Sequence, residues 1–332
     1  MRETAIAVDE LTRDYGTLRA VDHISFTVAP GEIFGFLGPN GAGKTTTLRM
    51  LTTILSPTSG RALIHGYDVQ RHSYDARLHF GVVPEESNIF SELSAWDNLM
   101  FSARLYQVPR GQSEQRAEQL LRLFDLWERR QVKTQFFSRG MRRKVTIAMS
   151  LIHTPSVLFL DEPTSGLDVQ STRAIHELVR SLNRDGMTIF LTTHRMEEAN
   201  ALCHRIAIIN HARIAAIDTP ANLRATMQQV QSVEVQLEGL APEDVQALGS
   251  LPSVARSLSH GTMLRLYTAE PVATIRHVLA YADERGKDVT ALDSVGPSLE
   301  DVFLYLTGGA DAIGTEAPAA PEAARQPRGG GR

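Results

Sequence analysis

Residues 38–46 of the chain read Gly38-Pro39-Asn40-Gly41-Ala42-Gly43-Lys44-Thr45-Thr46. The segment follows an apolar run, IFGFL, that predicts a β-strand, and it opens a helical pattern, TTLRMLTTIL. Glycines between a strand and a helix let backbone N–H groups converge on phosphate oxygens at the positive end of the helix. In this spacing the lysine reaches the β- and γ-phosphates and the next hydroxyl binds Mg²⁺. The segment therefore predicts a nucleoside triphosphate site with Lys44 and Thr45 in those roles.

A second apolar run ends in two acids and reads Val157-Leu158-Phe159-Leu160-Asp161-Glu162. It predicts a buried parallel strand whose carboxylates lie at the carboxyl edge of a sheet, where α/β proteins bind ligands. Neighbouring side chains on a strand point to opposite faces, so the two acids can do different jobs. We expect Asp161 to bind Mg²⁺ through water and Glu162 to lie beside the attacking water.

Composition and charge limit the classes of function. The 332 residues, 42% of them hydrophobic, suggest about two domains with cores of their own. The net charge of −4 provides no overall positive field for nucleic acid, so none is expected as a partner. The single cysteine, Cys203, cannot form an internal disulfide. The first residues, MRETAIAVDE, lack a secretory signal and no apolar run approaches 18 residues, so we expect a cytoplasmic chain.

The order of patterns predicts two domains and a tail. Residues 1–230 alternate β-rich and helical patterns, which predicts an α/β domain with a mostly parallel sheet. Within it we expect an antiparallel β portion before residue 38, an inserted helical region at 95–126 and a hairpin at 204–218. Thr219 is a plausible N-cap for a short closing helix. Residues 231–307 predict a small α+β domain, of ferredoxin-like type. Residues 308–332 contain seven Ala, six Gly and three Pro, which predicts a disordered tail.

Further motifs in the same order resemble those of the ATP-binding subunits of ABC transporters over about residues 4 to 228. They are Phe137-Ser138-Arg139-Gly140-Met141-Arg142-Arg143-Lys144, Ser165-Gly166-Leu167-Asp168, and His194 after the strand-like TIFLTT. The resemblance implies a P-loop NTPase fold of ABC type that hydrolyses ATP with Mg²⁺. It also implies a dimer of two such chains and a separate multi-spanning membrane permease, at the cytoplasmic face of the membrane.

The resemblance assigns a role to each matching residue. Glu162 is implied as the general base, and Lys44 and His194 as stabilising charge on the transferred phosphoryl group. Tyr15 would stack on adenine. Across the dimer, Ser138 and Gly140 would meet the γ-phosphate held by the other chain, and the loop ending at Asp168 would cross the interface.

Two departures from the family pattern affect these roles. Residues 137–144 occupy the position of the family's signature motif, and there Arg139 and Met141 replace the usual glycine and glutamine. Arg139 would either contact phosphate or point to solvent. Glu85 stands where most relatives have a glutamine that touches Mg²⁺ and the attacking water. An ionised carboxylate can bind Mg²⁺ but cannot donate a hydrogen bond, so Glu85 is expected to keep the metal role.

Three further segments allow more than one interpretation. The helical insertion resembles the subdomain that docks the membrane subunit, and residues near Phe90 and Trp96 would line the groove while others form local core. The basic run Arg142-Arg143-Lys144 is interpreted as a solvated helix face rather than a lipid or nucleic-acid patch. The segment Pro297 to Phe303 closes a domain that resembles the C-terminal extension of the daunorubicin/doxorubicin-resistance type, and we expect no catalytic residue there.

The sequence thus favours the ATP-hydrolysing subunit of an exporter of a drug-like or lipophilic molecule. One alternative is a soluble ABC-type ATPase that acts on ribosomes or DNA. Such relatives carry a long coiled coil or two ATPase halves in one chain, whereas this chain has a single phosphate loop and an insertion of only about 30 residues. A non-hydrolytic scaffold is the other alternative. The presence of both Glu162 and His194 argues against it.

Overall fold

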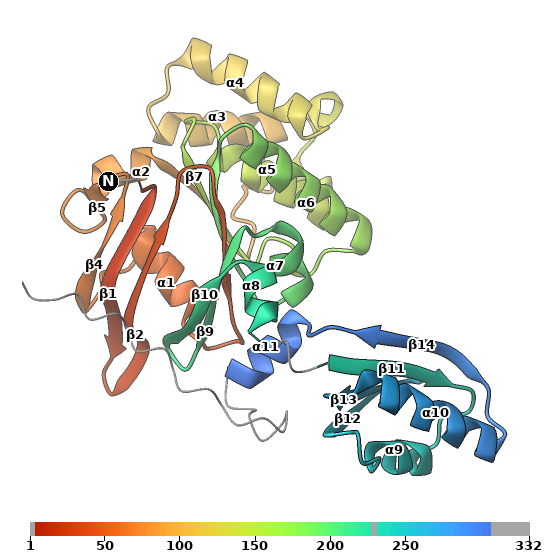
Figure 1. The fold of residues 1–332 in the computed structure, drawn as a ribbon. Coiled ribbons are helices and arrows are strands. Elements are labelled where there is room, and N and C mark those ends of the chain that lie inside the picture. The colour runs from red at the N-terminus through yellow and green to blue at the C-terminus, as the bar shows by residue number, and fades with distance from the viewer. Residues whose placement is uncertain (1–3, 227–230, 307–332) are drawn as a thin grey trace, which may run out of the picture. The chain divides into compact units, whose positions relative to one another are not determined.

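A six-stranded sheet forms the centre of the first part of the chain (Figure 1), in the order β10-β9-β3-β8-β7-β6. Its strands are β3 (Ile33–Leu37), β6 (Phe80–Val83), β7 (Val157–Asp161), β8 (Thr188–Thr193), β9 (Arg205–Asn210) and β10 (Arg213–Asp218). All neighbours pair in parallel except the β9–β10 hairpin. Every residue of β3, β7 and β8 is buried, as expected for strands covered on both faces. The predictions of a mostly parallel sheet and of the hairpin are confirmed.

The computed structural model describes residues 4–226 and 231–306, which divide into two units between Leu223 and Arg224. The tail predicted at 308–332 lies outside the described residues. In the part of the chain that is described, no helix is both long and apolar enough to cross a membrane.

A second, antiparallel sheet lies beside the first in the same unit, in the order β2-β1-β4-β5. It contains β1 (Ile6–Tyr15), β2 (Leu18–Val28), β4 (Ser59–Ile64) and β5 (Tyr67–Asp68). Phe26 of β2 stacks on Phe34 of β3 and Phe190 of β8, with ring centroids 5.3 and 5.9 Å apart. These aromatic contacts join the two sheets through one core, and the expected coexistence of two sheet types is confirmed.

Helices cover the parallel sheet and form the predicted insertion. They are α1 (Lys44–Leu51), α2 (Ser73–Leu78), α3 (Ala95–Leu105), α4 (Arg110–Leu123), α5 (Arg139–Ser150), α6 (Val169–Arg184), α7 (Met196–Leu202) and α8 (Pro220–Ala225). Short 3-10 turns span Trp127–Arg129 and Thr134–Phe136. The insertion consists of α3 and α4, which pack on α5. Thr219 caps α8 as predicted, because its Oγ1 accepts from the Asn222 amide at 3.1 Å.

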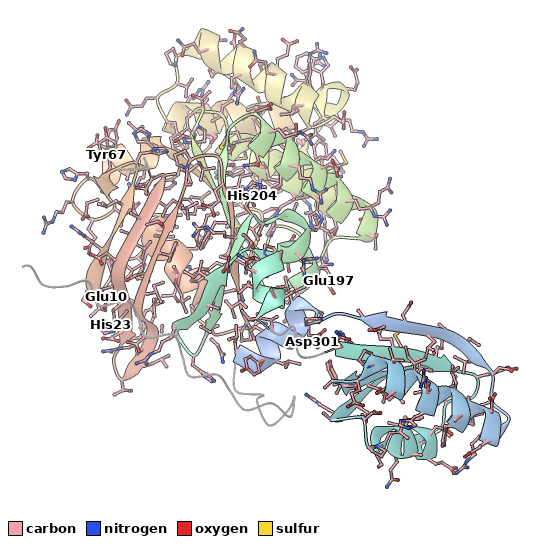
Figure 2. All side chains as sticks on the ribbon, viewed as in Figure 1. Glu10, His23, Tyr67, Glu197, His204 and Asp301 are labelled. Atoms are coloured by element: carbon pink, nitrogen blue, oxygen red, sulfur yellow. The ribbon has the colours of Figure 1, made fainter. Side chains whose placement is uncertain are left out.

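Close backbone packing explains two glycines inside strands. A Cβ on Gly35 of β3 would lie 2.6 Å from the sulfur of Cys203, and one on Gly81 of β6 would lie 2.2 Å from the carbonyl oxygen of Ser150. Cys203 is buried there, and burial raises the pKa of its thiol. At the start of the same strand the Ile33 amide donates to Nδ1 of His204, the residue after Cys203, at 3.1 Å; His204 is labelled in Figure 2.

The second unit has the element order βαββαβ, followed by a last helix. Its elements are β11 (Gln231–Leu237), α9 (Pro242–Gly249), β12 (Arg256–His260), β13 (Met263–Thr268), α10 (Pro271–Arg285), β14 (Val289–Val295) and α11 (Leu299–Leu306). The antiparallel sheet order β12-β13-β11-β14 is that of a ferredoxin-like fold, as expected. The edge strand β12 was not predicted. Asp301 of α11, labelled in Figure 2, is buried. It accepts from Tyr267 Oη at 2.6 Å and Arg265 Nη2 at 2.9 Å.

The close contact at Gly81 yields a stability prediction. Gly81→Ala forces a Cβ against a backbone carbonyl of α5 that cannot easily move, so we expect a loss of about 1–3 kcal/mol in the free energy of unfolding. Gly111→Ala is the matched control, because Gly111 lies in α4 with open space around it, and it should stabilise the chain by up to about 1 kcal/mol. Urea unfolding of both variants measures the difference, and equal midpoints would contradict the packing.

Candidate active site

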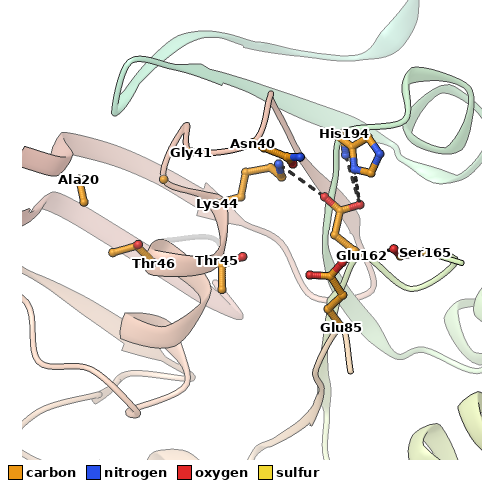
Figure 3. A pocket seen from close by; sticks show the side chains of 11 residues that line it. Ala20, Asn40, Gly41, Lys44, Thr45, Thr46, Glu85, Glu162, Ser165 and His194 are labelled. Atoms are coloured by element: carbon orange, nitrogen blue, oxygen red, sulfur yellow. Dashed lines mark hydrogen bonds and ion pairs between the residues drawn. The ribbon is translucent and has the colours of Figure 1, made fainter. Parts of the chain in front are cut away.

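Three neighbouring strand ends bring the predicted phosphate loop, the acidic pair and the histidine to one place. The loop follows β3, Asp161 and Glu162 lie at the end of β7, and His194 follows β8, which pairs with both other strands. A cavity of about 350 Å³ opens at this edge (Figure 3). Its lining is Ala20, Asn40, Gly41, Gly43, Lys44, Thr45, Thr46, Glu85, Glu162, Ser165 and His194.

The backbone of the loop requires glycine at several positions. Gly41 and Gly43 have φ of 81° and 109°, in the left-handed region. A Cβ on Gly43 would lie 2.5 Å from the Ala20 carbonyl oxygen, and one on Gly38 would lie 2.3 Å from the Ile209 carbonyl oxygen. Gly43 is the N-cap of α1, so the positive end of that helix lies at the cavity. This arrangement favours a bound anion such as a phosphate group.

Lys44 is 5% exposed, and its ammonium group has three acceptors nearby. Nζ donates to the carbonyl oxygens of Gly38 and Pro39 at 2.8 and 3.1 Å and lies 3.5 Å from Glu162 Oε1. Figure 3 shows Glu162 between this lysine and His194. The positive charge therefore lies at the mouth of the phosphate loop and is partly neutralised by the acid.

Glu162 is held in place on both sides. Its φ of 45° is uncommon for a residue other than glycine, and its amide donates to the carbonyl and hydroxyl oxygens of Thr192 at 3.1 and 3.2 Å. Its Oε2 accepts from His194 Nδ1 at 2.9 Å, in the tautomer that places the proton on that nitrogen. His194 is half-exposed, so a buried carboxylate and an accessible imidazole form one hydrogen-bonded pair.

The oxygen atoms suited to a metal ion belong to Thr45, Asp161 and Glu85. Asp161 Oδ1 accepts from Thr192 Oγ1 at 2.5 Å and lies 3.5 Å from Thr45 Oγ1. Glu85 is exposed, and its Oε1 accepts from Ser165 Oγ at 3.3 Å. Hydroxyl and carboxylate oxygens are ligands that Mg²⁺ prefers, and Mg²⁺ takes its remaining ligands from phosphate and water. The donor set therefore fits that ion.

Eight of the predicted site residues are not part of the cavity lining. Gly38, Pro39, Ala42 and Asp161 belong to the phosphate loop and the acidic pair, and the other four lie on elements separate from these. Tyr15 ends β1, is 44% exposed and has the Arg13 guanidinium 4.7 Å from its ring centroid. Ser138 caps α5, where its Oγ accepts from the Met141 amide at 3.2 Å. A Cβ on Gly140 would lie 2.6 Å from Ser171 Oγ.

Asp168 is the last of these other four residues and caps α6. It accepts from the Ser171 amide and hydroxyl, both at 2.8 Å, and these hydrogen bonds lower the pKa of its carboxyl. Because Gly140 also packs on Ser171, the N-termini of α5 and α6 lie side by side. This placement brings the signature segment next to the loop that ends at Asp168.

The interpretation of the basic run as a solvated helix face is wrong for Arg143, which is only 3% exposed. Its guanidinium donates to the backbone carbonyls of Pro84, Glu85, Asp161, Glu162 and Pro163. Helical spacing could have indicated this burial. Arg143 precedes the buried Ile147 by one turn, so the two side chains lie on the same face of α5. Lys144 is also partly buried, and its Nζ donates to the Phe124 carbonyl at 3.0 Å.

Arg139, Phe90 and Trp96 differ in exposure and in their contacts. Arg139 is exposed, and its Nη1 donates to the Gly166 carbonyl at 3.4 Å. Phe90 is exposed and packs edge-on against Phe101, with ring centroids 4.7 Å apart. Trp96 is half-buried, with its ring centroid 6.2 Å from that of Trp127.

Comparisons with known proteins agree with this geometry. Residues 21–165 match the model of the ABC transporter family. The chain is 38% identical over 309 residues to a Nod factor export ATP-binding protein of Paraburkholderia xenovorans, covering 93% of this chain and 98% of the relative. It is 37% identical over 311 residues to a daunorubicin resistance ATP-binding protein of Streptomyces coeruleorubidus, covering 93% and 97%.

A solved ATP-binding subunit of an ABC transporter is also similar in structure. It superimposes with a TM-score of 0.62 at 29% identity, covering 68% of this chain and 93% of the other. The matched relatives are covered almost end to end, and the fold agrees with their class. The chain therefore belongs to the family of ABC transporter ATP-binding subunits, which hydrolyse ATP and work with separate membrane permease subunits.

Proposed function

We propose that two copies of this chain close on two Mg-ATP molecules and power the export of a drug-like or lipophilic molecule through a separate permease, at the cytoplasmic face of the membrane. The observation that carries the proposal is the contact chain from Lys44 through Glu162 to His194 at the mouth of the phosphate loop. A lysine ammonium group, a carboxylate and an imidazole line one cavity, which supports roles in binding phosphate and activating water.

Binding of ATP uses the loop and the lysine. The phosphates lie at the N-terminus of α1, and Lys44 exchanges loop carbonyls for the β- and γ-phosphate oxygens. Tyr15, exposed at the end of β1, stacks on the adenine ring. Thr45, Asp161 and Glu85 would hold Mg²⁺, and the ion would supply positive charge next to the phosphate oxygens.

Hydrolysis then depends on Glu162. The buried carboxylate orients the attacking water and accepts its proton, and the Thr192 contacts keep it in position. His194 holds Oε2 of the same carboxylate and, with Lys44, stabilises charge on the transferred phosphoryl group. A half-exposed histidine is accessible to the γ-phosphate from the cavity side.

The dimer is supported by the exposed N-termini of α5 and α6. Ser138, Gly140 and Asp168 lie outside the cavity of their own chain. In a dimer, each copy would present these residues to the nucleotide bound by the other copy. A helix N-terminus that begins with Ser138 favours a negatively charged phosphate. ATP would therefore bridge the two chains and stabilise the closed state.

Export is favoured by the two kinds of relative. One is named for Nod factor export and the other for daunorubicin resistance, and both match this chain over almost their whole length. The two relatives are named for different molecules although both resemble this chain, which supports a mechanism in which the permease, and not the ATP-binding subunit, selects the exported molecule. The surface we assign to the permease is formed by Phe101 of α3, in the helical insertion, and Phe90 just before it, which are both exposed and pack against each other.

Glu162→Gln tests the base. The amide cannot accept a proton, so kcat for ATP hydrolysis should fall about a hundredfold or more while ATP binding remains. With ATP and Mg²⁺ the variant should elute as a dimer in size-exclusion chromatography. Glu197→Gln, which changes an exposed acid three residues after His194, should keep wild-type turnover. Unchanged turnover in the Glu162 variant would refute the assignment.

Lys44→Ala tests the phosphate contact instead. Loss of a charged donor to the phosphates should weaken ATP binding about ten- to a hundredfold, measured by titration of a fluorescent ATP analogue. Arg49→Ala removes an exposed cation from the same helix and should leave the affinity unchanged. Equal affinities for the two variants would contradict the role of Lys44.

Affinity capture tests the partner. A tagged Glu162→Gln chain, recovered from its native cells with ATP and Mg²⁺ present, should bring down a multi-spanning membrane protein. Recovery of ribosomes or DNA-associated proteins without such a partner would refute the exporter and support the soluble class. The ATP chemistry would stand in either case.

A further inference from the structure

Arg143 of α5 occupies a ring of backbone oxygens that come from two separate segments. Its Nε donates to the Pro163 carbonyl at 2.9 Å, and its Nη2 donates to those of Asp161 and Glu162 at 2.9 and 3.1 Å. Its Nη1 donates to the carbonyls of Pro84 and Glu85. The guanidinium therefore binds the end of β7 and the loop after β6 together.

These contacts use the whole hydrogen-bonding capacity of the side chain. A guanidinium has five N–H groups in a fixed plane, and each of them has one of the five carbonyls as its acceptor. Burial lowers the pKa of Arg143 to about 10, with the carboxylates of Asp161, Glu198 and Glu85 acting in the opposite direction. The group is still charged near neutral pH, so a buried cation faces the negative ends of five carbonyl dipoles.

The two segments held by Arg143 are those that carry the acidic residues of the site. One contains Asp161 and Glu162, and the other contains Glu85, whose side chain reaches Ser165 of the first segment. The guanidinium contacts backbone carbonyl oxygens and not the carboxylate oxygens. It therefore fixes the backbone positions from which the acidic side chains extend. The helix that carries Arg143 starts just after Ser138, its N-cap.

We infer that Arg143 is a positioning residue that fixes the loops of Glu85 and of Asp161-Glu162 to α5, so that the Mg²⁺ ligands and the base keep their places relative to each other and to the helix that begins after Ser138. The inference rests on the proposed function, since it assigns a role to those acids. Arg143 contacts no substrate, and its effect on turnover passes through the two loops.

Lysine cannot replace this arginine. An ammonium group has three donors at one point, so it cannot reach five acceptors arranged around a plane. Arg143→Lys keeps the charge and most of the stem, which makes it the mildest variant that breaks the arrangement. Arg142→Lys is the matched control, because Arg142 is the preceding residue of the same helix, is only partly buried, and has no side-chain hydrogen bond or ion pair to either loop in the described residues.

The experiment uses the full chain and compares ATP hydrolysis, ATP binding and amide hydrogen exchange between variants. In steady-state ATP hydrolysis, Arg143→Lys should lower kcat at least tenfold while the Kd for ATP, set by the phosphate loop, changes less than threefold. It should also shift the Mg²⁺ dependence of turnover to higher concentration. Arg142→Lys should match the wild-type chain in all three quantities. Thermal unfolding of the wild-type chain and of both variants is measured in parallel. The assay temperature is set below the lowest of their unfolding transitions.

Amide hydrogen exchange, followed by mass spectrometry, supplies a readout that does not need turnover. Peptides covering residues 84–87 and 161–166 should exchange faster in Arg143→Lys, while peptides from the phosphate loop should not change. Unchanged exchange in those two segments overturns the inference. Unchanged kcat and Mg²⁺ dependence in a folded Arg143→Lys chain also overturns it, and so does a fall of kcat that is matched by an equal loss of ATP affinity.

The two readouts separate this inference from the proposed function. If the wild-type chain failed to hydrolyse ATP or Glu162→Gln left turnover unchanged, the proposed function would fail. The exchange of the two segments would still decide whether Arg143 holds them. If turnover fell in Glu162→Gln as expected but exchange stayed constant in Arg143→Lys, only the positioning role would be refuted.

Discussion

The parallel pairing of β3, β8 and β7 is the constraint on which the rest of the site depends. Leu37 pairs with Thr193 and Asp161 pairs with Thr192, so the three strands end at nearly the same level. Each strand is completely buried, which leaves its carboxyl end as the first point where polar side chains can gather. The phosphate loop, the acidic pair and His194 meet because they follow neighbouring strands.

Two buried cations stabilise the loops at this edge from opposite sides. Lys44 approaches Glu162 through its side chain, while Arg143 binds the backbone of the same residue. Burying a charge without a partner is costly, and here every cation is surrounded by acceptors and every nearby acid has a donor. The resulting network holds Glu162 by both its backbone and its side chain, while Glu85 is exposed and its side chain accepts from one hydroxyl.

Local patterns were sufficient to predict the main features of the fold and the site. The glycine loop and the acidic strand end were visible because buried strands leave apolar runs next to polar functional residues, whereas His194 was singled out by the resemblance to the family. The burial of Arg143 was not visible, since its acceptors come from residues 84–85 and 161–163, far from it in sequence. The strand β12, RSLSH, was missed because an edge strand with one pairing partner needs few apolar residues.

The packing of Cys203 against Gly35 has a practical consequence for spectroscopy. It is the single cysteine of the whole chain, it is buried, and the raised pKa of its thiol keeps it in the unreactive protonated form. A cysteine introduced at an exposed position would therefore react selectively with a thiol-directed fluorophore or spin label. The native thiol, closely packed under β3, need not be removed first, so label pairs can report distances between copies of an otherwise unaltered chain.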